Sequence, residues 1–289
     1  AEVLKALLQR YPGVKADVGE VVVGNVLCKA MSTHARMAAL VAGLPTATAV
    51  HALSRQCASG LQALVDAVRA VQNRQCEVAV AVGVESMSTG DMVDIGDVSP
   101  SVFDEPRAAA CLTPMGATSD ELARRYSVSR EKQDAFAVES HCRALAAAKE
   151  GIFAAEIAPV SVDGRAVAAD EGPRECTAAD LSRLRAAFGE GGTATAGNSS
   201  QLSDGAAAAL VCTRAYAQKH GLPVLGCLRS FAVCGVDPAV MGVGPAAAIP
   251  LALAQAGVAA TDVSVFEINE AFASQALWCA AELGLPADR

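Results

Sequence analysis

The residue best placed by its surroundings to act as a nucleophile is Cys57. It lies in the run Arg55-Gln56-Cys57-Ala58-Ser59-Gly60-Leu61, where a predicted strand turns into a predicted helix. The free N–H groups at the N-terminus of a helix favour the thiolate, which is the form of cysteine that attacks an acyl carbon, and they can also hold an oxyanion. The alternative is that Cys57 is a small apolar core residue, as free cysteines often are.

A cysteine nucleophile needs a base, and the sequence assigns none to Cys57. His51 is the nearest histidine along the chain, but six residues of extended strand place it about 20 Å away. His34 and His141 fall on predicted helices and His220 at a helix end, where a surface or capping role describes each of them.

Two further segments place polar residues at predicted turns. In Glu267-Ile268-Asn269-Glu270-Ala271-Phe272-Ala273, Asn269 could position a water or polarise a carbonyl, and Glu270 could titrate. An asparagine cap followed by a surface glutamate would give the same seven residues. Residues 195–208 are mostly small and lead into an apolar strand, which suits either close approach of a ligand or a turn between two layers.

The elements that position these residues belong to a folded α/β chain. With 289 residues, 52% of them apolar, the sequence predicts one or two globular domains and excludes extensive disorder. No unbroken apolar run without a helix breaker or charge approaches the ~20 residues of a membrane span. A net charge of −8 without runs of Lys or Arg argues against nucleic acid.

The ten cysteines show neither a C-x-x-C pair nor zinc-ligand spacing, so the sequence predicts no structural metal site. Their placement in apolar stretches, together with the absence of signal-peptide character, indicates reduced thiols in an intracellular compartment. We expect most of them to fill space in the core.

Cys57 is part of the clearest predicted unit, a strand–helix–strand motif. Residues 46–53 read as a strand and residues 77–84 as a strand buried on both faces. Between them, residues 58–72 read as a helix whose predicted apolar face consists of Leu61, Leu64, Val65, Val68 and Val71.

The middle of the chain has a different character. Residues 88–114 read as loop, Thr118 and Glu121 have capping-box spacing before one helix, and Ser129 is the predicted N-cap of another that ends at Gly151. A further short helix is expected near residues 178–188. We therefore interpret residues 90–200 as a helical and loop insertion in a larger α/β frame.

An internal repeat links the two ends of the sequence. Residues 12–18 and the strand at 21–23 resemble residues 256–263 and an apolar stretch at 265–268, and residues 42–45 resemble residues 283–286. The repeat predicts two copies of one α/β half, with a further strand at 224–233 in the second copy. An opening strand in the first copy and a counterpart of the Cys57 turn in the second would lie outside the 289 residues, so we expect a longer protein.

Taken in order, four motifs resemble the thiolases over essentially the whole chain. Pro114, where biosynthetic thiolases typically have histidine, and Gln201 look most like the peroxisomal 3-ketoacyl-CoA thiolases. The motifs are Arg55 to Ala63 around Cys57, Val82 to Ser88, Ala196 to Ser200, and Asn269 to Phe272.

The resemblance implies a fold and a division of the chain. The fold is an α/β thiolase fold, with two related α/β halves in a five-layered αβαβα arrangement and an inserted loop domain. Residues 1–90 and 201–222 would form the N-terminal half, residues 91–200 the loop domain, and residues 223–289 part of the C-terminal half.

The resemblance also implies roles for individual residues. Cys57 would take an acyl group from 3-ketoacyl-CoA and pass it to a second CoA, and Asn269 would hold a water in an oxyanion hole. The implied CoA contacts are Met115, Phe188, Ser200, Ala271 and Phe272, with Arg174 near a phosphate. CoA would be a co-substrate and no cofactor is expected.

The family's activating histidine, in a Gly-His-Pro turn, and its second cysteine, in a Cys-x-Gly-x-Gly loop, would both follow Arg289. We therefore expect the 289 residues alone to be inactive or nearly so. The expected function is thiolytic cleavage in fatty-acid β-oxidation by a homodimer or dimer of dimers in peroxisomes, with mitochondria or cytoplasm as alternative compartments. Alternative functions are a biosynthetic acetoacetyl-CoA thiolase and a non-catalytic protein that binds acyl-CoA.

Overall fold

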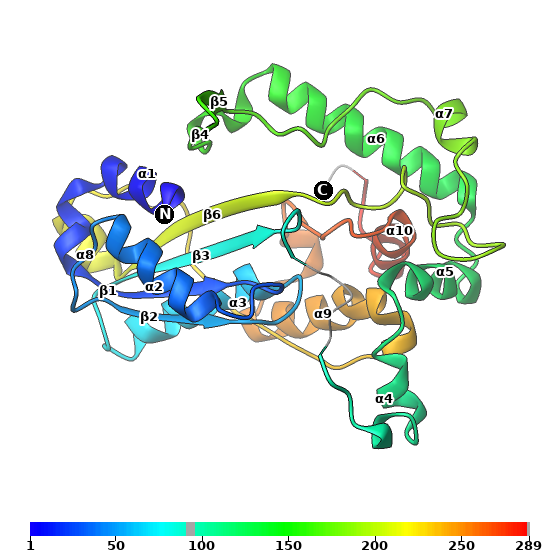
Figure 1. Ribbon diagram of the computed structural model, residues 1–289, viewed down its shortest axis with the longest axis horizontal. Helices are drawn as coiled ribbons and strands as arrows, with labels where there is room; N and C mark the ends of the chain where they lie inside the picture. The colour runs from blue at the N-terminus through cyan, green and yellow to red at the C-terminus, as the bar shows by residue number, and fades with distance from the viewer. Residues whose placement is uncertain (91–95, 288–289) are drawn as a thin grey trace. The chain divides into compact units, whose positions relative to one another are not determined.

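A four-stranded sheet forms the centre of one of the two units into which the contacts within the chain divide it (Figure 1). The computed structural model describes residues 1–90 and 96–287. The first unit consists of Ala1–Asp94, Glu156–Ala168 and Leu202–Leu228, and the second of Ile95–Ala155, Ala169–Gln201 and Arg229–Arg289. This division follows compactness; the division into two halves and a loop domain stays a prediction.

The sheet contains the predicted strand–helix–strand unit. Its strands are β1 (Val18–Gly24), β2 (Ala49–Leu53), β3 (Val78–Ser86) and β6 (Asp204–Cys212), in the order β2-β1-β3-β6. β1 pairs in parallel with both β2 and β3, whereas β6 is antiparallel to β3. The connection from β2 to β3 passes through α3 (Ser59–Gln72), as the sequence predicts, with β1 inserted between the two strands.

The two faces of the sheet are covered by different helices because side chains alternate along each strand. Val21 and Val23 of β1 pack in one core cluster with α1 (Glu2–Arg10) and α2 (Met31–Val41). Val22 and the small residues Ala79 and Ala81 pack in a second cluster with α3. The first unit is therefore a sheet between two helical layers.

The predicted apolar face of α3 is partly wrong. Leu61 is 53% exposed, whereas the residues of α3 in contact with the sheet include the buried Ala63, Ala67 and Val71. Alanines of α3 lie against the small Ala79 and Ala81 of β3, which allow the helix to approach closely, and Leu64 packs against the same cluster while partly buried.

The second unit is mainly helical. Helix α10 (Ala273–Glu282) packs against α5 (Met115–Arg125), α6 (Arg130–Lys149) and α9 (Gly244–Ala256). A hydrogen bond of 2.8 Å between the hydroxyls of Ser119 and Ser274 joins α5 to α10 in the buried interior.

The remaining elements of the two units are short: the α-helices α4 (Pro106–Ala110), α7 (Ala178–Ser182) and α8 (Arg214–Lys219), the hairpin β4 (Val160–Val162) and β5 (Arg165–Val167), and 3-10 helices at 12–17, 100–102, 152–155, 238–243 and 260–262.

The helix-start predictions for the second unit have mixed outcomes. Ser129 is the N-cap of α6, as predicted, and its hydroxyl accepts a hydrogen bond from the Lys132 N–H. The capping box at Thr118 is wrong, because α5 begins at Met115 after Pro114 and the Thr118 hydroxyl donates to the Met115 carbonyl inside the helix.

Two other expectations for this region are also corrected. The short helix α7 ends at Ser182, well before residue 188. Residues 100–102 and 106–110 are helical within the stretch predicted as loop; residues 91–95 of that stretch lie outside the described residues.

The predicted repeat is visible in helix ends but not in strands. Gly43 after α2 and Gly284 after α10 both have positive φ, and in each case the next residue donates to a carbonyl five positions earlier, Leu44 to Ala39 and Leu285 to Ala280. The predicted strands at 224–233 and 265–268 are absent from the structure of these described segments. An extended apolar segment becomes a strand only beside a hydrogen-bonded neighbour.

One stretch, Pro238–Ala256, is long and apolar enough by composition to cross a membrane. Its helical geometry is interrupted at Val240, where φ is −133°, and the α-helix that follows has 13 residues. At 1.5 Å per residue this helix is about 20 Å long, shorter than a bilayer core of about 30 Å.

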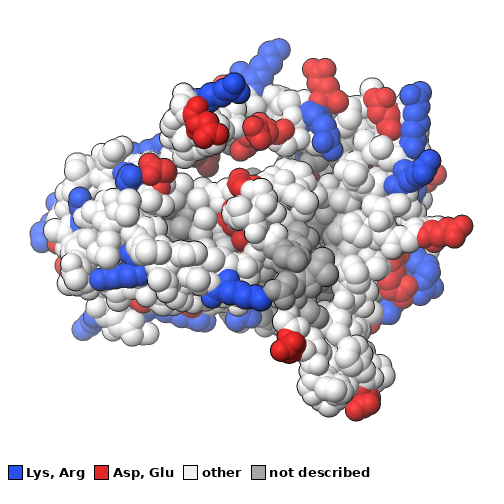
Figure 2. All heavy atoms as spheres, in the orientation of Figure 1, with Lys and Arg blue, Asp and Glu red and all other residues white. Residues whose placement is uncertain are grey.

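The charged side chains of the surface do not separate by sign on the face seen in Figure 2, where positive and negative side chains are interspersed.

Candidate active site

The turn that carries Cys57 is fixed by the buried Ser59. The Ser59 hydroxyl accepts from the Arg55 N–H at 2.8 Å and donates to the Gln56 carbonyl at 2.6 Å. Gln56 has φ of +48°, a left-handed conformation that costs energy in a residue other than glycine. The two Ser59 hydrogen bonds hold this conformation immediately before Cys57.

Three glycines allow the start of α3 to rest on the sheet. A Cβ on Gly24, the last residue of β1, would lie 2.3 Å from the Ser59 carbonyl oxygen and 2.7 Å from the Gly60 nitrogen. A Cβ on Gly83 of β3 would lie 3.5 Å from the Gly60 Cα. The helix N-terminus is therefore pressed against the carboxyl end of β1, the edge at which parallel α/β sheets commonly bind ligands.

Cys57 itself is exposed at this turn. This exposure contradicts the interpretation of Cys57 as a core residue and agrees with a role as a nucleophile. Behind it, the Arg55 guanidinium donates to the Gln62 side chain at 2.8 Å, and Gln62 donates in turn to Asp66 at 2.8 Å. This chain of hydrogen bonds ties the turn to the first two turns of α3. Because Cys111, Cys142 and Cys227 are exposed as well, the core-filling interpretation fails for these cysteines too.

No hydrogen bond joins Cys57 to a histidine among the described residues. Each of the four histidines interacts elsewhere: His51 with Glu20 at 3.0 Å, His34 with Cys28 at 3.3 Å, His141 with the Arg174 N–H at 3.3 Å, and His220 with the Tyr216 ring, centroids 4.0 Å apart.

In the second unit, the aromatic residues predicted to contact CoA form one cluster. The rings of Phe188 and Phe272 lie edge to face, with centroids 5.9 Å apart and planes at 81°. The Phe188 ring also lies on the backbone of Gly116, where an added Cβ would overlap it. Met115, directly before Gly116, is the first residue of α5 and is 39% exposed.

A pair of extended segments adds the remaining predicted CoA contacts except Arg174. The Ser200 N–H donates to the Ala271 carbonyl at 2.9 Å, and the Ala273 N–H donates to the Asn198 carbonyl at 2.9 Å. Ser199 and Phe272 form an antiparallel bridge between these bonds. Residues 198–200 and 271–273 are thus held side by side, with the Phe188 ring against them.

Asn269 and Glu270 are exposed just before α10. The capping explanation for Asn269 is wrong, because the N-cap of α10 is Phe272 and has no side-chain capping bond. Glu270 accepts a hydrogen bond of 2.6 Å from the Ser140 hydroxyl on α6, which anchors this segment to that helix.

Arg174 is exposed and lies near the same part of α6, where its backbone N–H donates to His141 Nδ1. The pKa of His141 is below its ordinary value, chiefly because burial disfavours the charged ring and also because Arg174 repels it, while Glu270 acts in the opposite direction. The guanidinium and the Glu270 carboxylate therefore both act on one imidazole.

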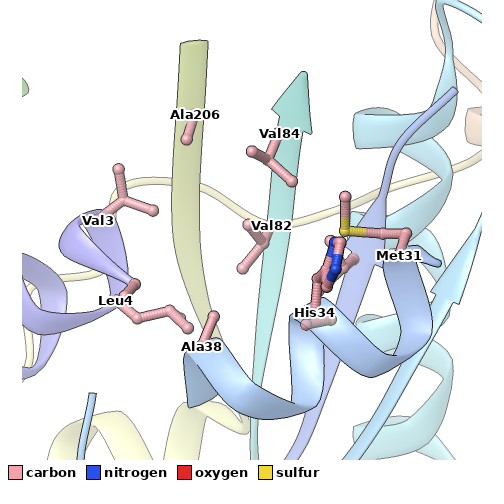
Figure 3. A pocket seen from close by; sticks show the side chains of 11 residues that line it. Val3, Leu4, Met31, His34, Ala38, Val82, Val84 and Ala206 are labelled. Carbon is pink, nitrogen blue, oxygen red and sulfur yellow. The ribbon is translucent and has the colours of Figure 1, made fainter. Parts of the chain in front are cut away.

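Two cavities formed by described residues do not have Cys57 in their lining. An apolar cavity of about 160 Å³ in the first unit contains none of the predicted site residues; Figure 3 shows Met31 and His34 of α2 with Val82 and Val84 of β3 along its wall. A groove of about 450 Å³ in the second unit is bordered by Phe188 and α5.

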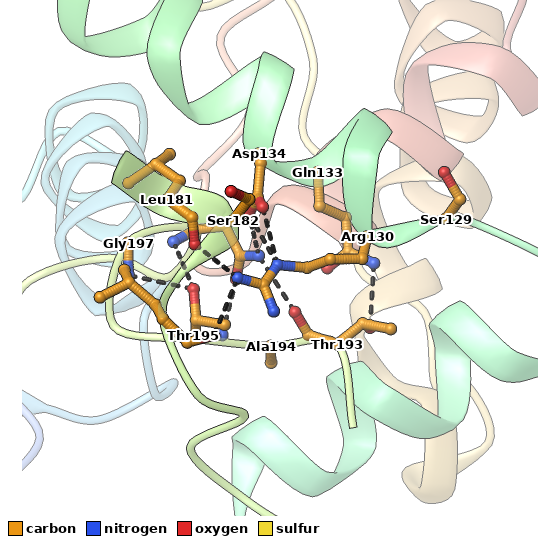
Figure 4. Close-up of polar contacts among 12 residues, drawn as sticks. Ser129, Arg130, Gln133, Asp134, Leu181, Ser182, Thr193, Ala194, Thr195 and Gly197 are labelled. Carbon is orange, nitrogen blue, oxygen red and sulfur yellow. Dashed lines mark hydrogen bonds and ion pairs between the residues drawn. The ribbon is translucent and has the colours of Figure 1, made fainter. Parts of the chain in front are cut away.

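Sequence reasoning missed the polar residues that support these segments. The buried Asp134, labelled in Figure 4, accepts a hydrogen bond from the side chain of the buried Asn198, which belongs to the loop of residues 193–200. Asn198 belongs to a motif that the sequence singled out, whereas the only signal for Asp134 is its position four residues after Arg130 on a helix.

Comparisons with known families agree over nearly the full chain. Residues 1–215 match the family described as "Thiolase, N-terminal domain", and residues 222–289 match "Thiolase, C-terminal domain". The chain is 46% identical to the rat peroxisomal 3-ketoacyl-CoA thiolase A, over 99% of this chain and 69% of the relative. It is 44% identical to the human peroxisomal 3-ketoacyl-CoA thiolase, over 99% of this chain and 70% of the relative.

Solved structures show the same similarity. The dimeric peroxisomal thiolase of Saccharomyces cerevisiae superposes with a TM-score of 0.95 at 41% identity, covering 99% of this chain and 76% of that one. The Bacillus anthracis acetyl-CoA acetyltransferase gives a TM-score of 0.86 at 34% identity, with the same coverage of both chains. The expected fold class is confirmed by these structures.

Proposed function

Because this chain belongs to the thiolase family, we propose that it is an acyltransferase that cleaves 3-ketoacyl-CoA with CoA, giving acetyl-CoA and an acyl-CoA shortened by two carbons. The observation that carries the proposal is the exposed Cys57 at the N-terminus of α3, on a turn held by Ser59 and pressed against Gly24. The peroxisomal relatives support the 3-ketoacyl class and a role in β-oxidation.

The chemistry proceeds in two half-reactions. The Cys57 thiolate attacks the 3-keto carbon, the bond between carbons 2 and 3 breaks, and acetyl-CoA leaves as an enolate that takes up a proton. The acyl group then remains on Cys57 as a thioester. The thiolate of a second CoA attacks this thioester, releasing the shortened acyl-CoA and restoring Cys57.

The predicted binding residues have separate roles in this proposal. Asn269 holds a water that donates to the thioester oxygen of the departing enolate. Phe188, Phe272, Met115, Ser200 and Ala271 line the pantetheine and adenine path, which is supported by their clustering in the second unit. Arg174 contacts a phosphate of CoA, and its exposure suits that role.

We further propose that the protein works as a homodimer in peroxisomes, with CoA as co-substrate and no bound cofactor. The dimeric yeast thiolase supports the assembly, and the names of the relatives support the compartment.

Steady-state kinetics of the full-length protein tests the proposal. The concentration of 3-ketoacyl-CoA is varied at several fixed concentrations of CoA. The resulting double-reciprocal lines should be parallel, as ping-pong chemistry requires. Cys57→Ala should abolish turnover, while Cys227→Ser, which changes another exposed cysteine, should leave it intact. Full turnover in the Cys57→Ala variant would contradict the proposal.

The acetyl-CoA acetyltransferase of Bacillus anthracis supports a second candidate, the biosynthetic condensation of two acetyl-CoA molecules. The choice depends on substrate length. A kcat/KM that is higher for longer 3-ketoacyl-CoA than for acetoacetyl-CoA favours the degradative function, and activity confined to acetoacetyl-CoA favours the biosynthetic one. Binding of acyl-CoA without turnover would indicate a non-catalytic protein.

A further inference from the structure

We propose that Asp134, with Arg130, is a positioning residue that sets the geometry of the segments proposed to bind CoA. Asp134 lies on α6 and is 3% exposed. Its carboxylate accepts from the Arg130 Nε at 2.8 and 2.9 Å (Figure 4). It also accepts from the Asn198 Nδ2 at 2.9 Å. The inference rests on the proposed function, because it concerns the same CoA contacts.

One arm of this network fixes the loop that ends at Ser200. The buried Asn198 also donates to the Thr193 carbonyl at 3.0 Å and accepts from the Thr195 N–H at 2.8 Å, so its side chain closes the loop upon itself. The backbone carbonyl of Asn198 accepts a hydrogen bond from the N–H of Ala273, the residue after Phe272. A shift of Asn198 would therefore displace both Ser200 and Phe272.

The other arm fixes the segment that leads to Phe188. The Arg130 guanidinium donates to the Leu181 carbonyl at 2.6 Å and to the Leu184 carbonyl at 3.1 Å, at the end of α7. The side chains of both leucines press on Gly197, where an added Cβ would lie 2.6 Å from each of them. The Arg130–Asp134 pair thus connects the approach to Phe188 with the approach to Ser200.

An ion pair in this position is directional in a way that apolar packing is not. Asp134 Oδ1 accepts from both Arg130 Nε and Asn198 Nδ2, and Oδ2 accepts from Arg130 Nε, so the two arms meet at one carboxylate. Asp134→Asn replaces one oxygen with an NH₂ group that faces Arg130 Nε in either orientation of the amide, so the Arg130 arm must move. A buried ion pair that loses one partner cannot be solvated in place.

The test measures CoA affinity by calorimetry in the full-length protein and in its variants. Asp134→Asn and Asn198→Ala should each weaken CoA binding by about tenfold, and the double variant by less than the product of the two, because both act through one hydrogen bond. Glu139→Gln, which breaks the exposed pair with Arg143 on the same helix, is the matched control and should bind CoA as the wild type does.

Hydrogen exchange supplies a reading that does not depend on CoA. In Asp134→Asn, the amides of Ser200 and Ala273 should exchange faster, while those of the Cys57 turn stay as in the wild type. A folded Asp134→Asn variant with unchanged affinity and unchanged exchange at these amides overturns the inference, as do single effects that multiply in the double variant.

The remaining outcomes are also decisive. If Asp134→Asn does not fold, unchanged CoA affinity in Asn198→Ala overturns the inference. If the wild type does not bind CoA while the amides of Ser200 and Ala273 respond to Asp134→Asn, the proposed CoA contacts are wrong and the positioning geometry alone is supported.

Discussion

Cys57 shares its exposure with Cys111, Cys142 and Cys227 but differs from them in its backbone setting. It follows a left-handed Gln56 and directly precedes the first turn of α3, the end of a helix at which the N–H groups have no partner within the helix. Cys279 is the opposite case, since burial raises the pKa of its thiol to about 11. One chain therefore contains a thiol placed for chemistry and a thiol placed for packing.

The Cys57 position was predictable from the sequence, but the conformation that presents it was not. A strand followed by a helix places residue 57 at the turn, and periodicity identifies both elements. Gln56 has no intrinsic preference for positive φ, and it adopts that conformation only because Ser59 bonds to both sides of it. The CoA contacts came from family resemblance, because clustering of residues so distant in sequence cannot be derived from spacing.

The titration of His141 is a prediction at the residue scale. Its lowered pKa means that the fold favours the neutral ring, which accepts from the Arg174 N–H. This contribution to stability is present above the pKa of free histidine and is lost as the pH falls through the lower pKa of the folded state. An NMR titration should place His141 below its ordinary value of 6.5.

Two substitutions check the cause of that shift. Arg174→Gln removes a repelling charge and should raise the pKa of His141, whereas Glu270→Gln removes an attracting charge and should lower it further. If the two variants shift the His141 titration in the same direction, this electrostatic explanation is wrong.

At the scale of elements, the approach of α3 to the sheet controls where Cys57 sits. Gly24→Ala would place a methyl group 2.3 Å from the Ser59 carbonyl oxygen, so the start of α3 must lift from β1. We expect alkylation of Cys57 by iodoacetamide to change by about tenfold or more, since the helix N-terminus sets thiol reactivity. Peptide mass spectrometry measures this rate.

Gly205→Ala is the control for that variant. Gly205 also lies in a strand, β6, and has nothing within 4 Å of an added Cβ. In the Gly205→Ala variant, Cys57 should be alkylated at the same rate as in the wild type. Equal rates in the Gly24 and Gly205 variants would show that the close approach does not govern Cys57.

Elements formed by local pattern were predicted better than elements that need a distant partner. The helix at 59–72 and the strands on either side of it follow from periodicity. The insertion of β1 between β2 and β3 does not, because strand order depends on long-range pairing. The same dependence explains why the apolar stretches at 224–233 and 265–268 are not strands in the structure.

At the scale of the whole molecule, the two units contain different parts of the proposed chemistry. The first provides Cys57, and the second provides the cluster around Phe188 and Phe272, supported by Asp134. The chain spans 69% of the length of its rat relative.

The central claim is that Cys57 accepts the acyl group, and peptide mass spectrometry after a single half-reaction tests it most directly. Full-length protein mixed with acetoacetyl-CoA, without free CoA, should release acetyl-CoA and retain an acetyl group on the peptide that contains Cys57, and Cys57→Ala should do neither. An acetyl group on a different residue, or equal release of acetyl-CoA by the Cys57→Ala variant, would contradict the account.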